Sequence, residues 1–233
     1  MNFSKTNVVL ILAFAVIVAG CKSKDKKRAS EQISYDQLYF DYSITAEDES
    51  ENVTCVFQYK DGGEEGKAVD IAPAKVELDG RLIETDSTKL SGFFFEVQKP
   101  LDSFTGKHSV VFITPDKRYA NDFAFTPFGL ENEMPEKVRR KPFIIQLKNF
   151  PAREKSLRLL LLDTAFASSG FNDLVPVIDG KINIDQTILS TIKNGPVNLE
   201  LYMEQELPLK QKTLAGGKIY ITYGLKREFE LVD

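Results

Sequence analysis

The chain has 233 residues, 42% of them hydrophobic, and carries 30 Lys and Arg against 34 Asp and Glu, a formal net charge of −4 at pH 7. The apolar content is enough to build a core, and the mild negative balance lacks the basic footprint of a nucleic-acid-binding domain, so no nucleic-acid partner is expected. Among the aromatic residues are 17 Phe and 8 Tyr but no Trp, the side chain that most often stacks against sugar rings.

The first twenty residues have the pattern of a secretory signal. Lys5 precedes an uncharged stretch at residues 8–19, which is too short to span a bilayer core because that takes about 20 apolar residues. A basic start, a short apolar stretch and small residues before a cleavage site predict a signal peptide over residues 1–20.

Val18-Ala19-Gly20-Cys21 resembles the lipobox of bacterial lipoproteins. The resemblance implies that Cys21 is acylated and becomes the mature N-terminus, with several acyl chains on one residue, as stable anchoring requires. The alternative is an ordinary signal peptide with an incidental cysteine. Lipidation of Cys21 leaves Cys55 as the one remaining cysteine, so no intramolecular disulfide is expected.

Residues 21–34 are predicted to be a flexible tether, because basic residues dominate and no apolar periodicity is present. Surface-exported lipoproteins of Bacteroidota carry an acidic cluster just after the lipidated cysteine, whereas here Asp25 is the one acidic residue between Cys21 and Ala29. The predicted location is therefore the bacterial cell envelope, lipid-anchored in the outer membrane, with the periplasmic and surface faces both left open.

Residues 35–127 are predicted to form a first β-sandwich. Apolar residues alternate with polar ones from Leu38 to Ile44 and from Val53 to Tyr59, which predicts strands with one buried face. Asp79-Gly80 predicts a type I′ hairpin between residues 75–78 and 81–83. Further strands are expected at residues 93–97, 109–114 and 119–125. Many short strands within about 90 residues favour a sandwich.

A linker is predicted at residues 128–142, which contain prolines and a charged run. Residues 143–233 are predicted to form a second β-sandwich, with another Asp-Gly hairpin at Asp179-Gly180. One helix is expected over residues 185–193, capped by Asp185. The strands expected in this part lie at residues 143–147, 157–162, 197–202, 219–223 and 229–232.

The predicted fold class is therefore all-β, with two tandem β-sandwich domains after the signal peptide and tether. The segments "ELDGRLI" at 77–83 and "VIDGKIN" at 177–183 are weakly similar to each other, as two copies of one repeat would be. Duplication of one unit and two independent sandwiches are equal alternatives. Over residues 35–233 the layout resembles Bacteroidota envelope lipoproteins that carry tandem immunoglobulin-like domains.

No metal site or cofactor is predicted. Residues 179–182 look like the centre of a calcium loop, but Val175 and Val177 would take the first and third ligand positions and offer no side-chain oxygen. The acidic run at residues 47–51 has the charge for a metal, yet a solvated loop between strands is the favoured interpretation.

No catalytic residue is predicted either. Cys55 alternates in phase with the buried set of its strand and has no neighbouring base to form a thiolate. His108 is the only histidine, and its place at a strand start predicts a surface role. No nucleophile, phosphate-binding or dinucleotide-binding motif occurs.

Phe94, Leu160 and Leu162 are the candidate binding residues, because strand alternation fails at these positions. Apolar residues on both faces indicate either packing between domains or an exposed patch for a partner. The function expected from the sequence is a non-catalytic, membrane-anchored protein-interaction module with an envelope protein partner. Binding of a glycan or another envelope polymer is the alternative, and an unrecognised hydrolase is the third reading.

Overall fold

Residues 34–233 are described by the computed structural model, so the predicted signal peptide, Cys21 and the tether up to residue 33 lie outside the described residues. Residues 34–233 form one compact unit. Across this described range, no helix has both the length and the apolar character needed to cross a bilayer.

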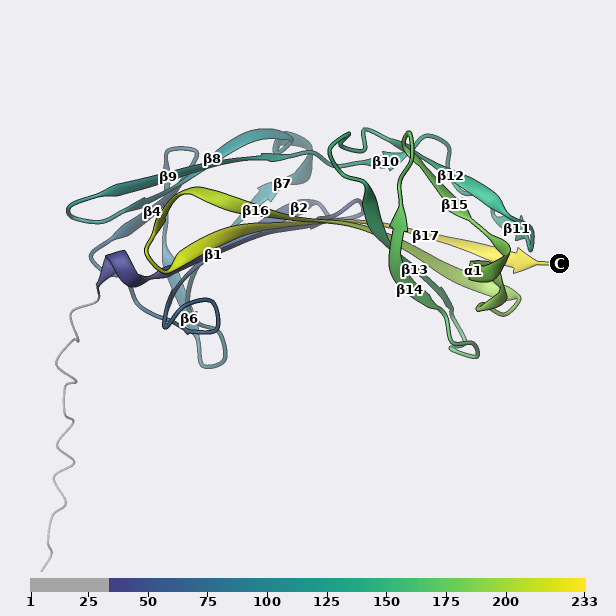
Figure 1. The fold of residues 1–233 in the computed structure, drawn as a ribbon, viewed down its shortest axis with the longest axis horizontal. Coiled ribbons are helices and arrows are strands. Elements are labelled where there is room, and N and C mark those ends of the chain that lie inside the picture. Colours follow the sequence, from purple (N-terminus) through teal and green to yellow (C-terminus); the bar gives the residue numbers. More distant parts are fainter. Residues whose placement is uncertain (1–33) are drawn as a thin grey trace, which may run out of the picture. The chain divides into compact units, whose positions relative to one another are not determined.

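The described chain is built from strands, and the all-β prediction is confirmed (Figure 1). The strands are β1 (Tyr39–Glu47), β2 (Asn52–Asp61), β3 (Lys67–Ala68), β4 (Lys75–Leu78), β5 (Arg81–Ile83), β6 (Thr85–Thr88), β7 (Gly92–Pro100), β8 (Gly106–Ile113), β9 (Arg118–Phe125), β10 (Gly129–Leu130), β11 (Lys137–Arg139), β12 (Phe143–Lys148), β13 (Ser156–Asp163), β14 (Phe171–Pro176), β15 (Lys181–Ile184), β16 (Gly195–Thr213) and β17 (Gly216–Val232). The helices are α1 (Gln186–Ser190) and the 3-10 turns η1 (Tyr35–Gln37) and η2 (Leu101–Ser103).

A ten-stranded sheet, here called the shared sheet, has the order β14-β13-β16-β17-β1-β2-β7-β6, with β11 beside β17 and β3 beside β2. A four-stranded sheet, β5-β4-β8-β9, covers the part of it that contains β1 and β2. A three-stranded set, β10-β12-β15, covers the part that contains β13 (Figure 1). The arrangement is two sandwiches that have one sheet in common.

The first core lies between β1 and β2 on one side and β8 and β9 on the other. The predicted alternation is confirmed, because Phe40 and Tyr42 of β1 and Tyr59 of β2 are buried. Phe40 and Tyr59 contact Phe112 of β8 with ring centroids 5.2 and 4.3 Å apart, respectively. Aromatic pairs of this kind contribute more than their buried area alone.

The second core is built from leucines of the shared sheet and isoleucines of the covering strands. Leu159 of β13 and Leu199 of β16 are buried, as is Ile184 of β15. Phe143 of β12 and Phe229 of β17 meet edge to face across this core at 6.4 Å.

Local signals in the sequence predicted the turns and the helix start correctly. Asp79 and Gly80 both have positive φ, 51° and 75°, and Asp179 and Gly180 repeat this at 51° and 70°. These are the angles of a type I′ hairpin. The side chain of Asp185 caps α1, because its Oδ1 accepts a hydrogen bond from the Ile188 N–H at 2.9 Å.

The predicted assignment of the C-terminal strands to a second domain is wrong. Residues 219–223 and 229–232 belong to one strand, β17, and β16 extends past residue 202 to Thr213. Residues 217–224 of β17 pair with β1, so they complete the first sandwich. The same strand pairs with β11 at residues 230–232, within the second sandwich.

A run of charged residues in the middle of β17 makes its continuity hard to predict from the sequence. The buried alternation of Tyr223, Leu225 and Phe229 is interrupted in the sequence by Lys226-Arg227-Glu228, which fall between the two strands expected at 219–223 and 229–232. In the structure Arg227 occupies the inward position and pairs with the carboxylates of Asp48 and Glu133. A paired charge is tolerated where an unpaired one would be costly.

The predicted linker at residues 128–142 is also corrected, because it is packed structure. Phe128 and Val138 are buried, and the Phe128 ring lies 5.4 Å from that of Tyr223. The Arg140 guanidinium donates hydrogen bonds to the carbonyls of Leu189 at 2.6 Å and Ile192 at 2.8 Å. The burial of these residues depends on distant partners, which local composition does not reveal.

The shared sheet makes a prediction about cooperativity. Phe57→Ala in the first core and Leu159→Ala in the second should each lower the free energy of unfolding, by about 3–5 and about 2–5 kcal/mol respectively. Because β16 and β17 enter both cores, we expect both variants to shift one and the same thermal transition in calorimetry. Two separate transitions, each moved by one variant alone, would contradict the shared sheet.

Candidate functional site

The structure brings two of the three predicted binding residues together. Leu160 and Leu162 lie on the outer face of β13, half-buried, while Leu157, Leu159 and Leu161 fill the core. Phe94 is half-buried on β7, where it pairs with Asp86 of β6. Four strands, β16, β17, β1 and β2, separate β13 from β7. Phe94 therefore belongs to no common site with the two leucines.

The hairpin formed by β13 and β14 carries two further apolar residues that the sequence analysis missed. Leu174 of β14 pairs with Arg158 of β13 and is 54% exposed. Phe166, in the loop between the two strands, is 78% exposed. We refer to Leu160, Leu162, Phe166 and Leu174 as the hairpin patch. The sequence signal for Phe166 is one aromatic residue among the small residues of 164–170.

Asp163 organises the loop that presents Phe166. The residue is 5% exposed. Its carboxylate accepts hydrogen bonds from the N–H groups of Ala167 at 2.7 Å and Ser168 at 2.9 Å, and from the Ser168 hydroxyl. The Ser168 hydroxyl and then the Ala167 N–H lower the pKa of this carboxyl. Phe166 has φ of 51°, a conformation that costs about 1–2 kcal/mol for a residue with a side chain. The loop therefore holds an exposed aromatic ring in a conformation that it would rarely adopt alone.

The hairpin patch lies at an edge of the shared sheet, because β14 is the terminal strand of the sheet order. Asp173 of β14 pairs with the buried Leu159 and yet is exposed. A charge at such a position disfavours uncontrolled pairing of an edge strand with another chain. The exposed Leu174 of this edge strand is thus accompanied by a charge that disfavours edge-to-edge aggregation.

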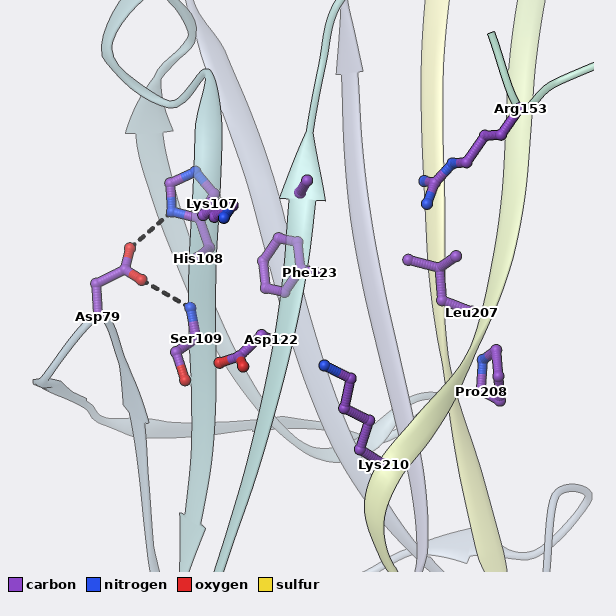
Figure 2. Close-up of a pocket in the computed structure, with 11 residues that line it drawn as sticks. Asp79, Lys107, His108, Ser109, Asp122, Phe123, Arg153, Leu207, Pro208 and Lys210 are labelled. Carbon is purple, nitrogen blue, oxygen red and sulfur yellow. Dashed lines mark hydrogen bonds and ion pairs between the residues drawn. The ribbon is translucent and has the colours of Figure 1, made fainter. Parts of the chain in front are cut away.

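A second feature is a hollow of about 610 Å³ between β8 and β9 on one side and β16 on the other (Figure 2). His108 lies in its wall. The prediction of a surface role for His108 is wrong, because its side chain is only 10% exposed. The ring stacks on Phe104 with centroids 3.8 Å apart.

Both nitrogens of His108 are engaged. Nδ1 lies 2.8 Å from Asp79 Oδ2, and Nε2 lies 2.7 Å from the Phe104 carbonyl oxygen. The other Asp79 oxygen accepts a hydrogen bond from the Ser109 N–H at 2.9 Å. Since neither ring nitrogen is directed at open space, His108 is placed as a structural residue of the wall and not as a general base.

The other candidate reactive or metal-binding groups considered from the sequence, Cys55 and Asp48 of the acidic run at 47–51, are also buried or paired. Cys55 is buried, and burial raises the pKa of its thiol to about 12. Asp48 of the acidic run at 47–51 pairs with Arg227 and accepts a hydrogen bond from the Lys226 N–H at 3.1 Å. Among residues 34–233, no group of three or more His, Cys, Asp or Glu side chains is placed to hold a metal ion.

No protein-family model matches this chain, and no curated protein matches it. It is similar to the solved structure of an immunoglobulin domain of Dpr11 bound to DIP-gamma, at 8% identity over 83% of this chain and 95% of that chain, with a TM-score of 0.25. It is also similar to tandem Ig domains of titin, at 9% identity over 83% and 95% of the two chains, with a TM-score of 0.23. TM-scores this low do not establish a shared fold, so the β-sandwich assignment is based on the strand pairing described above.

The contacts of Asp163 generate a prediction for the Phe166 loop. Asp163→Asn should lower the protection of the Ala167 and Ser168 amide protons against hydrogen exchange by roughly tenfold or more, because charge-assisted hydrogen bonds are lost. The folded-state pKa of Asp163 is lowered, so its contribution is present above the ordinary carboxyl pKa and is lost as the pH falls through the folded value. The variant should lack that acid-dependent loss of protection.

The matched control is Asp102→Asn, which changes an exposed carboxylate in η2. It should leave the protection of the Ala167 and Ser168 amides unchanged. Equal protection of these amides in the wild type and in Asp163→Asn would show that the carboxylate does not hold the loop.

Proposed function

We propose that this chain is a lipid-anchored, non-catalytic interaction module of the bacterial envelope, which holds a protein partner through the hairpin patch. The observation that carries the proposal is the exposure of Phe166 and Leu174 beside the half-buried Leu160 and Leu162 on one hairpin. Fully burying an exposed apolar side chain of this size is worth about 1.5–3 kcal/mol. Four such residues on one surface are enough to dominate an interface.

The polar neighbours of the patch favour a protein partner. Arg158 of β13 pairs with Glu204 of β16 at 3.3 Å, and Asn172 and Glu200 lie on either side of Leu160. An apolar centre with a polar rim is the arrangement of protein interfaces. Aromatic residues at the centre of such interfaces often carry most of the binding free energy.

The shape of the patch also disfavours a sugar ligand there. Its one aromatic ring is at the tip of a loop and not on a flat platform, and the other three residues are leucines. Phe166 is held outward by Asp163 before any partner arrives. A preorganised loop lowers the ordering entropy that association costs.

Anchoring rests on the lipobox-like Val18-Ala19-Gly20-Cys21. Cys21→Ser should move the protein from the membrane fraction to the soluble fraction or leave an uncleaved precursor, because acylation requires the thiol. Cys55→Ala is the matched control, since it removes the other cysteine, and it should stay with the membranes. An unmodified Cys21 in the mature native protein, detected by mass spectrometry, would rule out the anchor.

The hairpin patch is tested by placing a photo-crosslinking residue at Phe166 in the native membrane. We expect one predominant protein adduct, and we expect Leu174→Glu to reduce its yield at least tenfold by placing an unpaired charge in the interface. Thermal stability should be nearly unchanged, because exposed substitutions usually alter it by less than about 0.5 kcal/mol.

Leu214 provides the control, because it is 90% exposed at the turn between β16 and β17 and lies outside the patch. The same crosslinker at Leu214 should not give that adduct, and Leu214→Glu should not reduce the adduct formed at Phe166. Identical adducts at both positions, or no protein adduct at Phe166, would contradict the proposed interface.

A further inference from the structure

The hollow beside His108 gathers cationic side chains from three separate parts of the chain. Lys107 comes from β8, Lys210 from β16, and Arg153 from the segment between β12 and β13. Figure 2 shows the charged ends of Arg153 and Lys210 directed from the β16 side toward the space beside Phe123 of β9. Strands far apart in sequence thus bring like charges to one concave surface.

Two of the three cations of the hollow, Lys107 and Lys210, have no carboxylate partner among residues 34–233, whereas Arg153 pairs with Glu154. Asp79 and Asp122 are the two that line it, and both oxygens of Asp79 are already engaged, by His108 and by the Ser109 N–H. Within residues 34–233, neither Lys107 nor Lys210 lies within ion-pair distance of a carboxylate. Arg153 is paired with Glu154 at 3.2 Å, so Lys107 and Lys210 are the cations of the hollow that no carboxylate engages. Two unpaired ammonium groups on one concave surface attract an anion.

Arg153 is oriented for such a ligand. Its Nη2 donates to Gln205 Oε1 at 3.0 Å, and its Nε lies 3.2 Å from Glu154 Oε1. Half of the side chain remains exposed. The contacts fix the guanidinium plane while leaving donors on its open side, and the fork of an Arg matches carboxylate and phosphate oxygens.

Part of the remaining wall is apolar. Leu207 and Pro208 of β16 line one side, and the stack of His108 on Phe104 braces the other. A volume of about 610 Å³ lies within the range of small-ligand sites, which combine apolar walls with a few placed polar groups. The hollow therefore has room for a ring-sized body in addition to an anionic group.

We propose that this hollow binds an acidic saccharide unit, with its carboxylate or phosphate held by Lys107 and Lys210 and its ring against Leu207 and Pro208. This site goes beyond the protein-binding function proposed above and uses none of the residues of the hairpin patch. Carboxylate and phosphate share the chemistry that the lysines recognise, so the two sources are separated by the choice of probe.

The test is isothermal titration of the full chain in detergent with a galacturonate oligomer, glucose 6-phosphate, inorganic phosphate and a neutral maltose oligomer. At least one acidic sugar should bind ten times more tightly than both the neutral oligomer and inorganic phosphate, and the affinity should fall as salt rises. Lys107→Gln and Lys210→Gln should each weaken that binding at least fivefold, because each removes a charge-assisted hydrogen bond.

Lys212→Gln is the matched control, since it removes an exposed lysine of β16 that does not line the hollow, and it should bind like the wild type. Phe166→Glu should also bind normally, which separates this proposal from the hairpin patch. Failure of both acidic sugars to bind, equal binding of the neutral oligomer or inorganic phosphate, or binding insensitive to both lysine variants would overturn the proposal.

Discussion

The pairing of β16 with β17 is the interaction on which the rest of the structure depends. The two strands pair from Gly195 and Leu231 at one end to Thr213 and Gly216 at the other, with a shift after Pro208. The other edge of β17 receives β1 and then β11, while β16 receives β13. The β16–β17 hairpin therefore supplies strands to both cores. Continuous backbone pairing through these strands also links β13, which carries part of the hairpin patch, to β1, the first strand of the described fold.

A charged cluster marks the point where the sheet passes from one core to the other. Arg227 sits on the inner side of β17 between Leu225 and Phe229, and it pairs with Asp48 from the β1–β2 turn and with Glu133. On the outer side Tyr202 lies over Gly224, where a Cβ would come within 2.6 Å of the ring. Each charge of this cluster has a partner of opposite sign, which a half-buried ion needs to offset the loss of water. Asp48 of the acidic run is therefore engaged by Arg227, and no metal-binding cluster occurs among the described residues.

The parts of the fold that local chemistry controls could be predicted from the sequence. Alternation from Leu38 to Ile44 reflects one buried face, and Asp179-Gly180 fixes its turn by backbone preference alone. The continuity of β17 could not be predicted, because the pairing of Arg227 with Glu133 is a long-range contact. Within the candidate site, the sequence marks Leu160 by its broken alternation. It does not mark Phe166, whose exposure depends on how Asp163 folds its loop, or the cations of the hollow, which meet only where β16 lies against β9.

Amide hydrogen exchange along β17 tests the shared sheet most directly. If the strand is continuous, the amide protons from Ile219 to Leu231 that pair with β16 should exchange only through global unfolding, with one common free energy of opening. Those near Gly224 and Arg227 should then be protected as strongly as those in either core. A fast-exchanging break at residues 224–228, flanked by two protected stretches with different opening free energies, would show two sandwiches joined by a hinge and would contradict the account.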